Sequence, residues 1–223
     1  MEQYKKTRIT TLIFYLILYT IWALLECGFV PLLESHLTQI PIEIIMEIVL
    51  KTLLWFIPAF IILRKYGDSM YLSKSEITGS AGKIFTFIPM YIFILLFSAF
   101  LLISNYSQNG KIVISPSFHP AYFLIVIFIA VTEEMVFRGT LLNTALKKQN
   151  QWIAFSGNAL MFLMIHFPIW LREGVFTTYI TSFAFLQLIA LSFIFSWTFA
   201  KSRSIIVPVI LHAYWDLMCF AIA

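Results

Sequence analysis

The stretch that decides the fold spans residues 120–146 and reads PAYFLIVIFIAVTEEMVFRGTLLNTAL. It is long enough to cross a bilayer, because a spanning helix needs about 20 mainly apolar residues. Three charged residues, Glu133, Glu134 and Arg138, lie inside it. A charged side chain at the bilayer centre costs about 2.5–3.5 kcal/mol on insertion scales, so such residues usually face the protein interior and serve a function. The stretch therefore predicts a membrane helix that carries part of a buried polar site.

The composition of the whole chain is that of a membrane protein. Of its 223 residues, 61% are hydrophobic and 12% are charged, and the mean hydropathy is +0.89. An ordinary soluble domain carries about 25% charged residues, so a soluble enzyme, a disordered chain and a nucleic-acid-binding domain are excluded. The net charge of +4 does not indicate a nucleic-acid partner, because the basic residues lie in short groups between apolar runs.

Seven apolar segments predict an all-α, polytopic transmembrane bundle of about seven spans, which forms a single domain over residues 1–223. The first segment has no small-residue cleavage site after it, so we interpret it as a retained span and not as a signal peptide. The predicted spans are 9–33, 40–63, 84–104, 120–146, 152–170, 176–200 and 204–222. The polar interval 64–83 is interpreted as a loop and not as a second domain.

The basic residues predict the orientation of these spans. Only Lys111 and Arg172 fall in the segments that would lie outside if the N-terminus is cytoplasmic. Eleven basic residues fall on the cytoplasmic side: Lys5, Lys6, Arg8, Arg64, Lys65, Lys74, Lys83, Lys147, Lys148, Lys201 and Arg203. This bias predicts an N-in, C-out protein that crosses the cell membrane several times, in contact with the lipid bilayer. A bacterial plasma membrane is the expected location.

Ionisable residues also lie inside two later spans. Glu134 and Arg138 are four residues apart and share a helix face, whereas Glu133 points about 100° away. His166 follows in the fifth span, and His212 and Asp216 lie four apart in the seventh. At a rise of about 1.5 Å per residue, all of these groups lie between about 14 and 22 Å from the cytoplasmic ends of their helices. The common depth predicts one shared polar cavity.

Two carboxylates and two imidazoles can supply a general base, a general acid and groups that stabilise charge, which suits hydrolysis by an activated water. A zinc site made of Glu133, His166 and His212 is the alternative, because these residue types are zinc ligands. The spacing argues weakly against a metal, since the chain has no H-E-x-x-H pattern. The preferred mechanism therefore requires no cofactor.

The motifs Glu133-Glu134-x-x-x-Arg138, Phe162-x-x-x-His166 and His212-x-x-x-Asp216 resemble, in type and order, those of the CPBP family. These are intramembrane proteases related to the CAAX prenyl endopeptidases and to bacteriocin-processing or bacteriocin-immunity proteins, also called the Abi family. The resemblance covers residues 120–222, which would form the catalytic core. It implies an intramembrane protease that hydrolyses a peptide bond of a membrane-associated or hydrophobic peptide or protein.

The resemblance also implies roles for the residues of the three motifs. Glu133 would be the general base, aided by His166, and His212 with Asp216 would stabilise the oxyanion. Glu134 and Arg138 would order the site, or Arg138 would contact a carboxyl group of the substrate, near Phe162.

The last motif position is often Asn in the CAAX-processing relatives, whereas this chain has Asp216. An ionised aspartate cannot donate a hydrogen bond to an oxyanion. Asp216 would therefore be protonated, would orient His212, or would favour a metal.

Other interpretations remain open at this point. Glu43, Glu47 and Lys51 form a stripe on the second span, which we interpret as structural pairing or a wet entry groove. A non-catalytic membrane protein for binding, immunity or regulation on the same scaffold would not need hydrolysis. A proton-coupled transporter would also carry Glu, His and Arg near the midplane, but the chain has no internal repeat.

The predicted topology can be tested with reporter fusions. An alkaline phosphatase fused after Ala223 should be active and a fluorescent protein at the same place should be dark, because the C-terminus is expected outside. The same reporters placed after Lys148 should give the reverse result. A C-terminal fusion that is active only in the cytoplasm would overturn the orientation.

Overall fold

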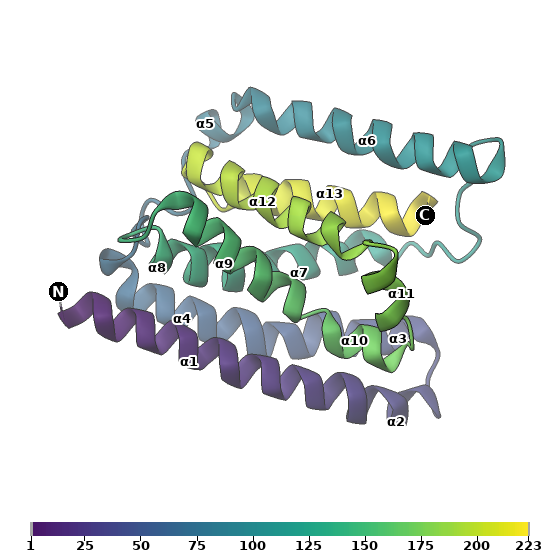
Figure 1. Ribbon diagram of the computed structural model, residues 1–223, viewed down its shortest axis with the longest axis horizontal. Coiled ribbons are helices and arrows are strands. Elements are labelled where there is room, and N and C mark those ends of the chain that lie inside the picture. Colours follow the sequence, from purple (N-terminus) through teal and green to yellow (C-terminus); the bar gives the residue numbers. More distant parts are fainter. Residues whose placement is uncertain (1, 223) are drawn as a thin grey trace.

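The computed structural model describes residues 2–222, apart from the side chain of Ala81. The chain is all-helical, with 80% of it in helices and no strand within the described range. The helices run roughly lengthwise and side by side, with the N-terminus at one end of the bundle (Figure 1). The predicted fold class is confirmed at this level.

The helical elements, in chain order, are α1 (Glu2–Leu24), η1 (Leu25–Phe29), α2 (Val30–Glu34), α3 (Gln39–Glu43), η2 (Ile44–Leu50), η3 (Thr52–Phe56), α4 (Ile57–Tyr66), η4 (Gly67–Ser69), α5 (Ala81–Phe85), α6 (Ile88–Asn109), α7 (Tyr122–Glu134), η5 (Met135–Leu142), α8 (Asn143–Ala145), α9 (Gln151–Met164), α10 (Phe167–Arg172), α11 (Phe176–Thr181), α12 (Phe185–Ser202) and α13 (Ile206–Ile222).

Consecutive elements join into longer rods, and five of these are long and apolar enough to cross a membrane. They are Glu2–Glu34, Gln39–Ser69, Ile88–Asn109, Gln151–Arg172 and Phe185–Ser202. The helix 206–222 is apolar but shorter, and the rod 122–145 carries three charges within its length. The chain is thus a multi-pass helical membrane protein, while the count of seven spans and the N-in, C-out orientation stay predictions.

The predicted span 176–200 is wrong as a single helix. The structure divides it into the short α11 and the long α12, with Phe183 between them at a left-handed φ of 61°. Thr177, Thr178 and Thr181 precede the break, and β-branched polar residues of this kind are weak helix formers.

The predicted span 84–104 also differs, because α6 begins at residue 88 and ends at 109. There Gly110 closes it at a φ of 70°, a conformation that glycine adopts without strain.

The rod made of α7, η5 and α8 lies in the middle of the bundle (Figure 1). Below it in this view lie α1 and α4, and above it lie α12, α13 and α6. Its residues Val136 and Phe137 are fully buried. Phe137 packs edge-on against Trp55 and Phe162, with ring centroids 6.3 and 5.1 Å apart. Charges on this rod are therefore surrounded by protein and not by lipid.

Three rods contain π-helical turns, at η1, at η2 with η3, and at η5. A π-turn inserts an extra residue and changes which side chains share a face, and such turns are frequent at functional sites. Glu26, Glu47 and Arg138 lie in these turns, and Lys51 lies between η2 and η3. The irregular helix segments thus coincide with the charged residues of the interior.

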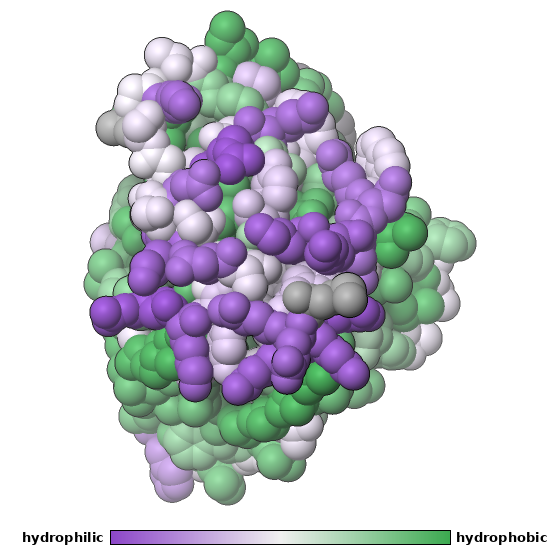
Figure 2. Space-filling model, turned by 90° about the vertical axis from the view of Figure 1, so that its left-hand side faces the viewer, coloured by the Kyte–Doolittle hydropathy of each residue, from purple (hydrophilic) through white to green (hydrophobic). Residues whose placement is uncertain are grey.

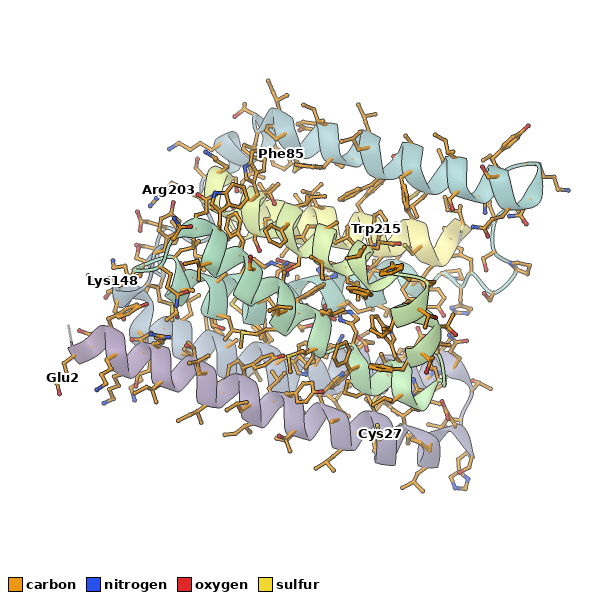
Figure 3. All side chains as sticks on the ribbon, viewed as in Figure 1. Glu2, Cys27, Phe85, Lys148, Arg203 and Trp215 are labelled. Atoms are coloured by element: carbon orange, nitrogen blue, oxygen red, sulfur yellow. The ribbon has the colours of Figure 1, made fainter. Side chains whose placement is uncertain are left out.

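Polar residues gather at the end of the bundle that holds the N-terminus, as a hydrophilic zone bordered by apolar side chains (Figure 2). Glu2, Lys148 and Arg203 lie at this end, and Cys27 lies toward the other (Figure 3). Arg203 pairs with Glu76 at 3.2 Å. The Ser73 backbone N–H and hydroxyl also donate to the Glu76 carboxylate, which holds its pKa below the ordinary range.

Of the interval 64–83, which is predicted to be a loop, residues 70–80 are a loop that packs against the bundle, whereas 64–69 continue the second rod and 81–83 begin α5. Asn143 fixes it from α8, because its Oδ1 accepts from the Leu72 N–H at 2.7 Å and its Nδ2 donates to the Leu72 carbonyl at 2.9 Å. Leu72 and Ile77, which belong to this loop, have buried side chains.

Candidate active site

Glu134 and Arg138 form a buried ion pair on the central rod, as their spacing predicts. Arg138 Nη1 lies 2.9 Å from Glu134 Oε1, and both side chains are completely buried. Arg138 Nη2 donates to the backbone carbonyl and to the hydroxyl of Ser192 on α12, at 3.1 and 3.0 Å. The guanidinium also lies over the rings of Phe162 and Phe195, 4.9 and 5.3 Å from their centroids. Arg138 thus joins three helices around the site.

Glu133 points away from this pair and has its own cation. Lys51 Nζ donates to Glu133 Oε1 at 2.7 Å and lies 2.5 Å from Glu47 Oε2. Lys51 is only 4% exposed and sits between the indole rings of Trp22 and Trp55, 5.1 and 4.9 Å from their centroids. The predicted Glu47–Lys51 pair is present, but its lysine also binds the proposed general base.

Sequence reasoning left Lys51 out of the catalytic set. Lys51 is the one lysine inside a predicted span. A charge inside a predicted span is also the reason why Arg138 is a candidate site residue. The role of Lys51 depends on which helix packs beside the second span, and the sequence does not contain that information.

His166 lies at the junction of α9 and α10. Its Nδ1 is 2.8 Å from the carbonyl of Phe162, one turn earlier. Because a carbonyl only accepts, Nδ1 carries the proton of the neutral ring, which leaves Nε2 as a free acceptor. Pro168 starts the next helix and helps to turn the chain at this point.

His212 is held between three carboxylates. Its Nδ1 lies 2.8 Å from Glu134 Oε1, and its Nε2 lies 3.4 Å from Asp216 Oδ2 and 3.8 Å from Glu133 Oε2. The ring stacks on Phe195 at a centroid distance of 5.0 Å. Of the three roles considered for Asp216, this geometry favours orientation of His212.

One cavity of about 390 Å³ joins these groups. Its lining includes the site residues Lys51, Glu133, Phe162, His166, His212 and Asp216. The common depth estimated from the sequence is thus matched by one shared space. Glu134 and Arg138 do not line it, so they lie behind its wall and hold the lining groups in place. Glu43, Glu47 and Glu173 also line this cavity.

The donor set does not fit a divalent metal well. Glu133 Oε1 is bound to the Lys51 ammonium, and a cation at this distance repels a second one. The Nδ1 contacts of His166 and His212 do not count against a metal, because a histidine that binds a metal through Nε2 commonly donates its other ring N–H to a carbonyl or a carboxylate. Within residues 2–222, no group of three or more His, Cys, Asp or Glu side chains is arranged to hold a metal ion. We therefore derive no catalytic step through a metal.

Comparison with known proteins finds a similarity in the second half of the chain. Residues 115–218 match the family model described as Rce1-like, the type II CAAX prenyl endopeptidases. No curated protein and no solved structure matches the chain. The matched range contains all three motifs, so the resemblance to the CPBP family is confirmed for this part.

Replacing Arg138 by Met should destabilise the protein by about 3–5 kcal/mol, because the Glu134 carboxylate would stay buried without its cation. The double variant Glu134→Gln/Arg138→Met should lose clearly less than the sum of the single variants. Thermal or denaturant unfolding of the purified protein in one detergent measures the three losses. Strictly additive losses would contradict the coupling.

Replacing Lys51 by Met should lower kcat by about 10²-fold or more, the scale of a disabled general base, with little change in KM. Lys51→Arg should restore most of the activity, because a guanidinium can also pair with Glu133 and Glu47. The readout is peptide hydrolysis by the purified variants, with unfolding temperature as a control for folding. An arginine variant as inactive as the methionine variant, with both folded, would argue against this role.

Proposed function

Because residues 115–218 carry an Rce1-like domain, we propose that the protein is an intramembrane endopeptidase in which a glutamate activates water. Its substrate would be a membrane-associated or hydrophobic peptide or protein. The observation that carries the proposal is that Glu133, His166 and His212, from three separate rods, line one cavity inside the bundle. Such convergence supports the proposal, because a base, an acceptor and a donor would then be within reach of one bound peptide bond.

Water activation falls to Glu133 and His166. Glu133 Oε1 is bound to Lys51, so Oε2 is the oxygen that takes the proton of the water. His166 Nε2 accepts the second hydrogen of the same water and orients it, because Nδ1 is already used. The oxygen of the water then attacks the carbonyl carbon of the scissile bond.

Oxyanion stabilisation falls to His212. Both ring nitrogens face carboxylates, Glu134 at Nδ1 and Asp216 with Glu133 at Nε2, so both act as N–H donors of an imidazolium. His212 lines the cavity. When a substrate is bound, the N–H at Nε2 donates a hydrogen bond to the oxygen of the tetrahedral intermediate. Glu134, itself fixed by Arg138, keeps the ring in place during this change.

The proton held by Glu133 completes the reaction. When the tetrahedral intermediate collapses, the C–N bond breaks and the carboxyl group of Glu133 passes its proton to the leaving amine. Glu133 then returns to the ionised form, and its carboxylate pairs again with the Lys51 ammonium. The residues of the chain account for every proton transfer in this sequence.

The decisive experiment compares Glu133→Gln and His166→Ala with the native protein. Internally quenched peptides, one ending in a prenylated CAAX sequence and one without the prenyl group, are supplied to the purified protein in lipid nanodiscs. Both variants should lose about 10²–10⁴-fold in kcat. Membrane proteomics of cells that carry the native or the Glu133→Gln form should reveal accumulated, uncleaved substrates.

Glu43→Gln is the matched control. Glu43 lines the same cavity but binds Gln39 and Tyr122, so its amide form should stay close to native activity. If Glu133→Gln and His166→Ala keep full cellular function at equal expression, the protease proposal fails. The non-catalytic alternative, a membrane binding, immunity or regulatory protein, would then take its place. Cleavage of only the prenylated peptide would assign the substrate to the CAAX class.

A further inference from the structure

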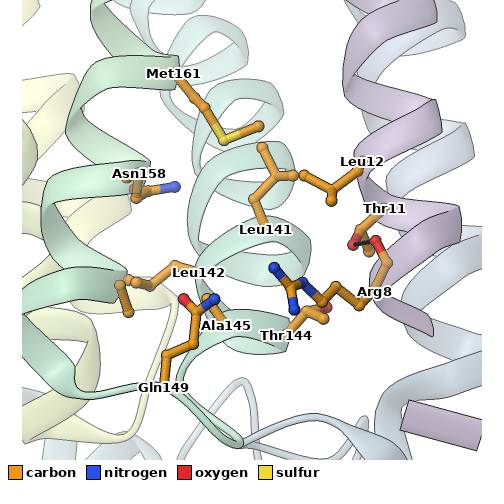
Figure 4. A pocket seen from close by; sticks show the side chains of 12 residues that line it. Arg8, Thr11, Leu12, Leu141, Leu142, Thr144, Ala145, Gln149, Asn158 and Met161 are labelled. Atoms are coloured by element: carbon orange, nitrogen blue, oxygen red, sulfur yellow. Dashed lines mark hydrogen bonds between the residues drawn. The ribbon is translucent and has the colours of Figure 1, made fainter. Parts of the chain in front are cut away.

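A second cavity lies at the end of the bundle that holds the N-terminus, between α1, the end of the central rod and α9 (Figure 4). Its volume is about 170 Å³, and it shares no lining residue with the catalytic cavity. The lining residues are Arg8, Thr11, Leu12, Leu141, Leu142, Thr144, Ala145, Gln149, Ala154, Gly157, Asn158 and Met161.

Two polar groups in this cavity lack a protein partner. The side chain of Arg8 extends from α1 across the cavity toward Thr144 (Figure 4). Arg8 is exposed, and its guanidinium has no ion pair with a residue in the range 2–222. The Thr144 hydroxyl is buried and without a hydrogen-bond partner, since Thr144 is only 2% exposed. A buried hydroxyl left unbonded is unfavourable, so a ligand that accepts a hydrogen bond from Thr144 and also pairs with Arg8 would be stabilised in this cavity.

Most of the remaining lining residues are apolar, and the polar ones among them are Thr11, Gln149 and Asn158. Leu12, which is 41% exposed, and Gly157 form the outer edge. A Cβ at Gly157 would find no atom within 4 Å, so the space beside it is open. Deeper in the bundle, the Tyr15 hydroxyl donates to the Met161 carbonyl at 2.7 Å and joins α1 to α9. The cavity thus has the exposed Leu12 and the open space beside Gly157 on one side and the α1–α9 hydrogen bond deeper in the bundle.

We propose that this cavity binds the phosphate of an anionic phospholipid. Arg8 would pair with the phosphate, the Thr144 hydroxyl would donate to one of its oxygens, and the acyl chains would run outside along Leu12. The volume equals that of about five or six water molecules, which suits a phosphate group but not a whole lipid. The exposed cations Lys5, Lys6, Lys147 and Lys148 at the same end add attraction for an anionic leaflet.

A phosphate could also come from solution, since the anion chemistry is the same. The structure favours the lipid, because the exposed apolar side chain of Leu12 is one of the residues that line the cavity. A free anion would make no use of the exposed leucine at the rim. The proposal does not depend on proteolysis, because its readout is binding.

The test is native mass spectrometry of the full chain, released from nanodiscs that contain equal amounts of phosphatidylglycerol and phosphatidylcholine. The native protein should retain one phosphatidylglycerol in preference to phosphatidylcholine. Arg8→Gln should reduce this preference about fivefold or more. Lys6→Gln, which removes the same charge from the same helix but does not line the cavity, should reduce the preference clearly less than Arg8→Gln does. Gly157→Leu should fill the open space and reduce retention without changing any charge.

Three outcomes would overturn the proposal. They are equal retention of the two lipids by the native protein, equal losses in the Arg8 and Lys6 variants, and displacement of phosphatidylglycerol by inorganic phosphate at millimolar concentration. The last outcome would assign the site to a free anion.

Unfolding temperatures of all variants serve as the control for folding. Gly157→Ala, which adds one methyl group, is the milder form of the filling variant.

Discussion

The pairing of buried charges inside an apolar bundle is the constraint on which the rest of this structure depends. An isolated charge in a medium of low dielectric constant is too costly to keep, whereas a paired and hydrogen-bonded charge is tolerated. Glu134 and Arg138 satisfy this within one helix, and Glu133 satisfies it with Lys51 from another rod. His212 bridges the two pairs through its ring nitrogens. The site is therefore one connected network that orders the helices around it.

The residues of this network differ in whether they line the cavity or lie behind its wall. The groups that face the cavity, Glu133, His166 and His212, are those that can reach a substrate. Arg138 lies behind them and is sealed by Phe162 and by other aromatic rings. The hydrogen bonds of this network hold its members in place, which is what preorganised catalysis requires, while Glu134 Oε2 and Arg138 Nε are buried without a hydrogen-bond partner within the described residues. The same aromatic residues that make the chain suited to lipid also isolate the arginine from it.

The sequence predicted the fold class and most helix ranges, because apolar runs and the charges between them report the membrane directly. It also predicted the Glu134–Arg138 pair, since a spacing of four residues is a local property of a helix. It missed the break at Phe183 and the partner of Glu133. The first depends on local backbone geometry, and the second depends on which face of the second span turns to the central rod. The π-turns in that span change its face by an extra residue, and spacing alone does not reveal this.

What the sequence determined by itself is where charge is scarce and at what depth it lies. Periodicity along one helix and a fixed rise per residue are enough for that, because both are properties of a single helix. Only the tertiary structure decided how the charges pair and which of them face a cavity. Lys51 and Ser192 could not be connected to the motif residues from spacing, since they lie 82 and 54 positions from Glu133 and Arg138. Contacts across such separations arise from helix packing, and packing is a property of the whole chain.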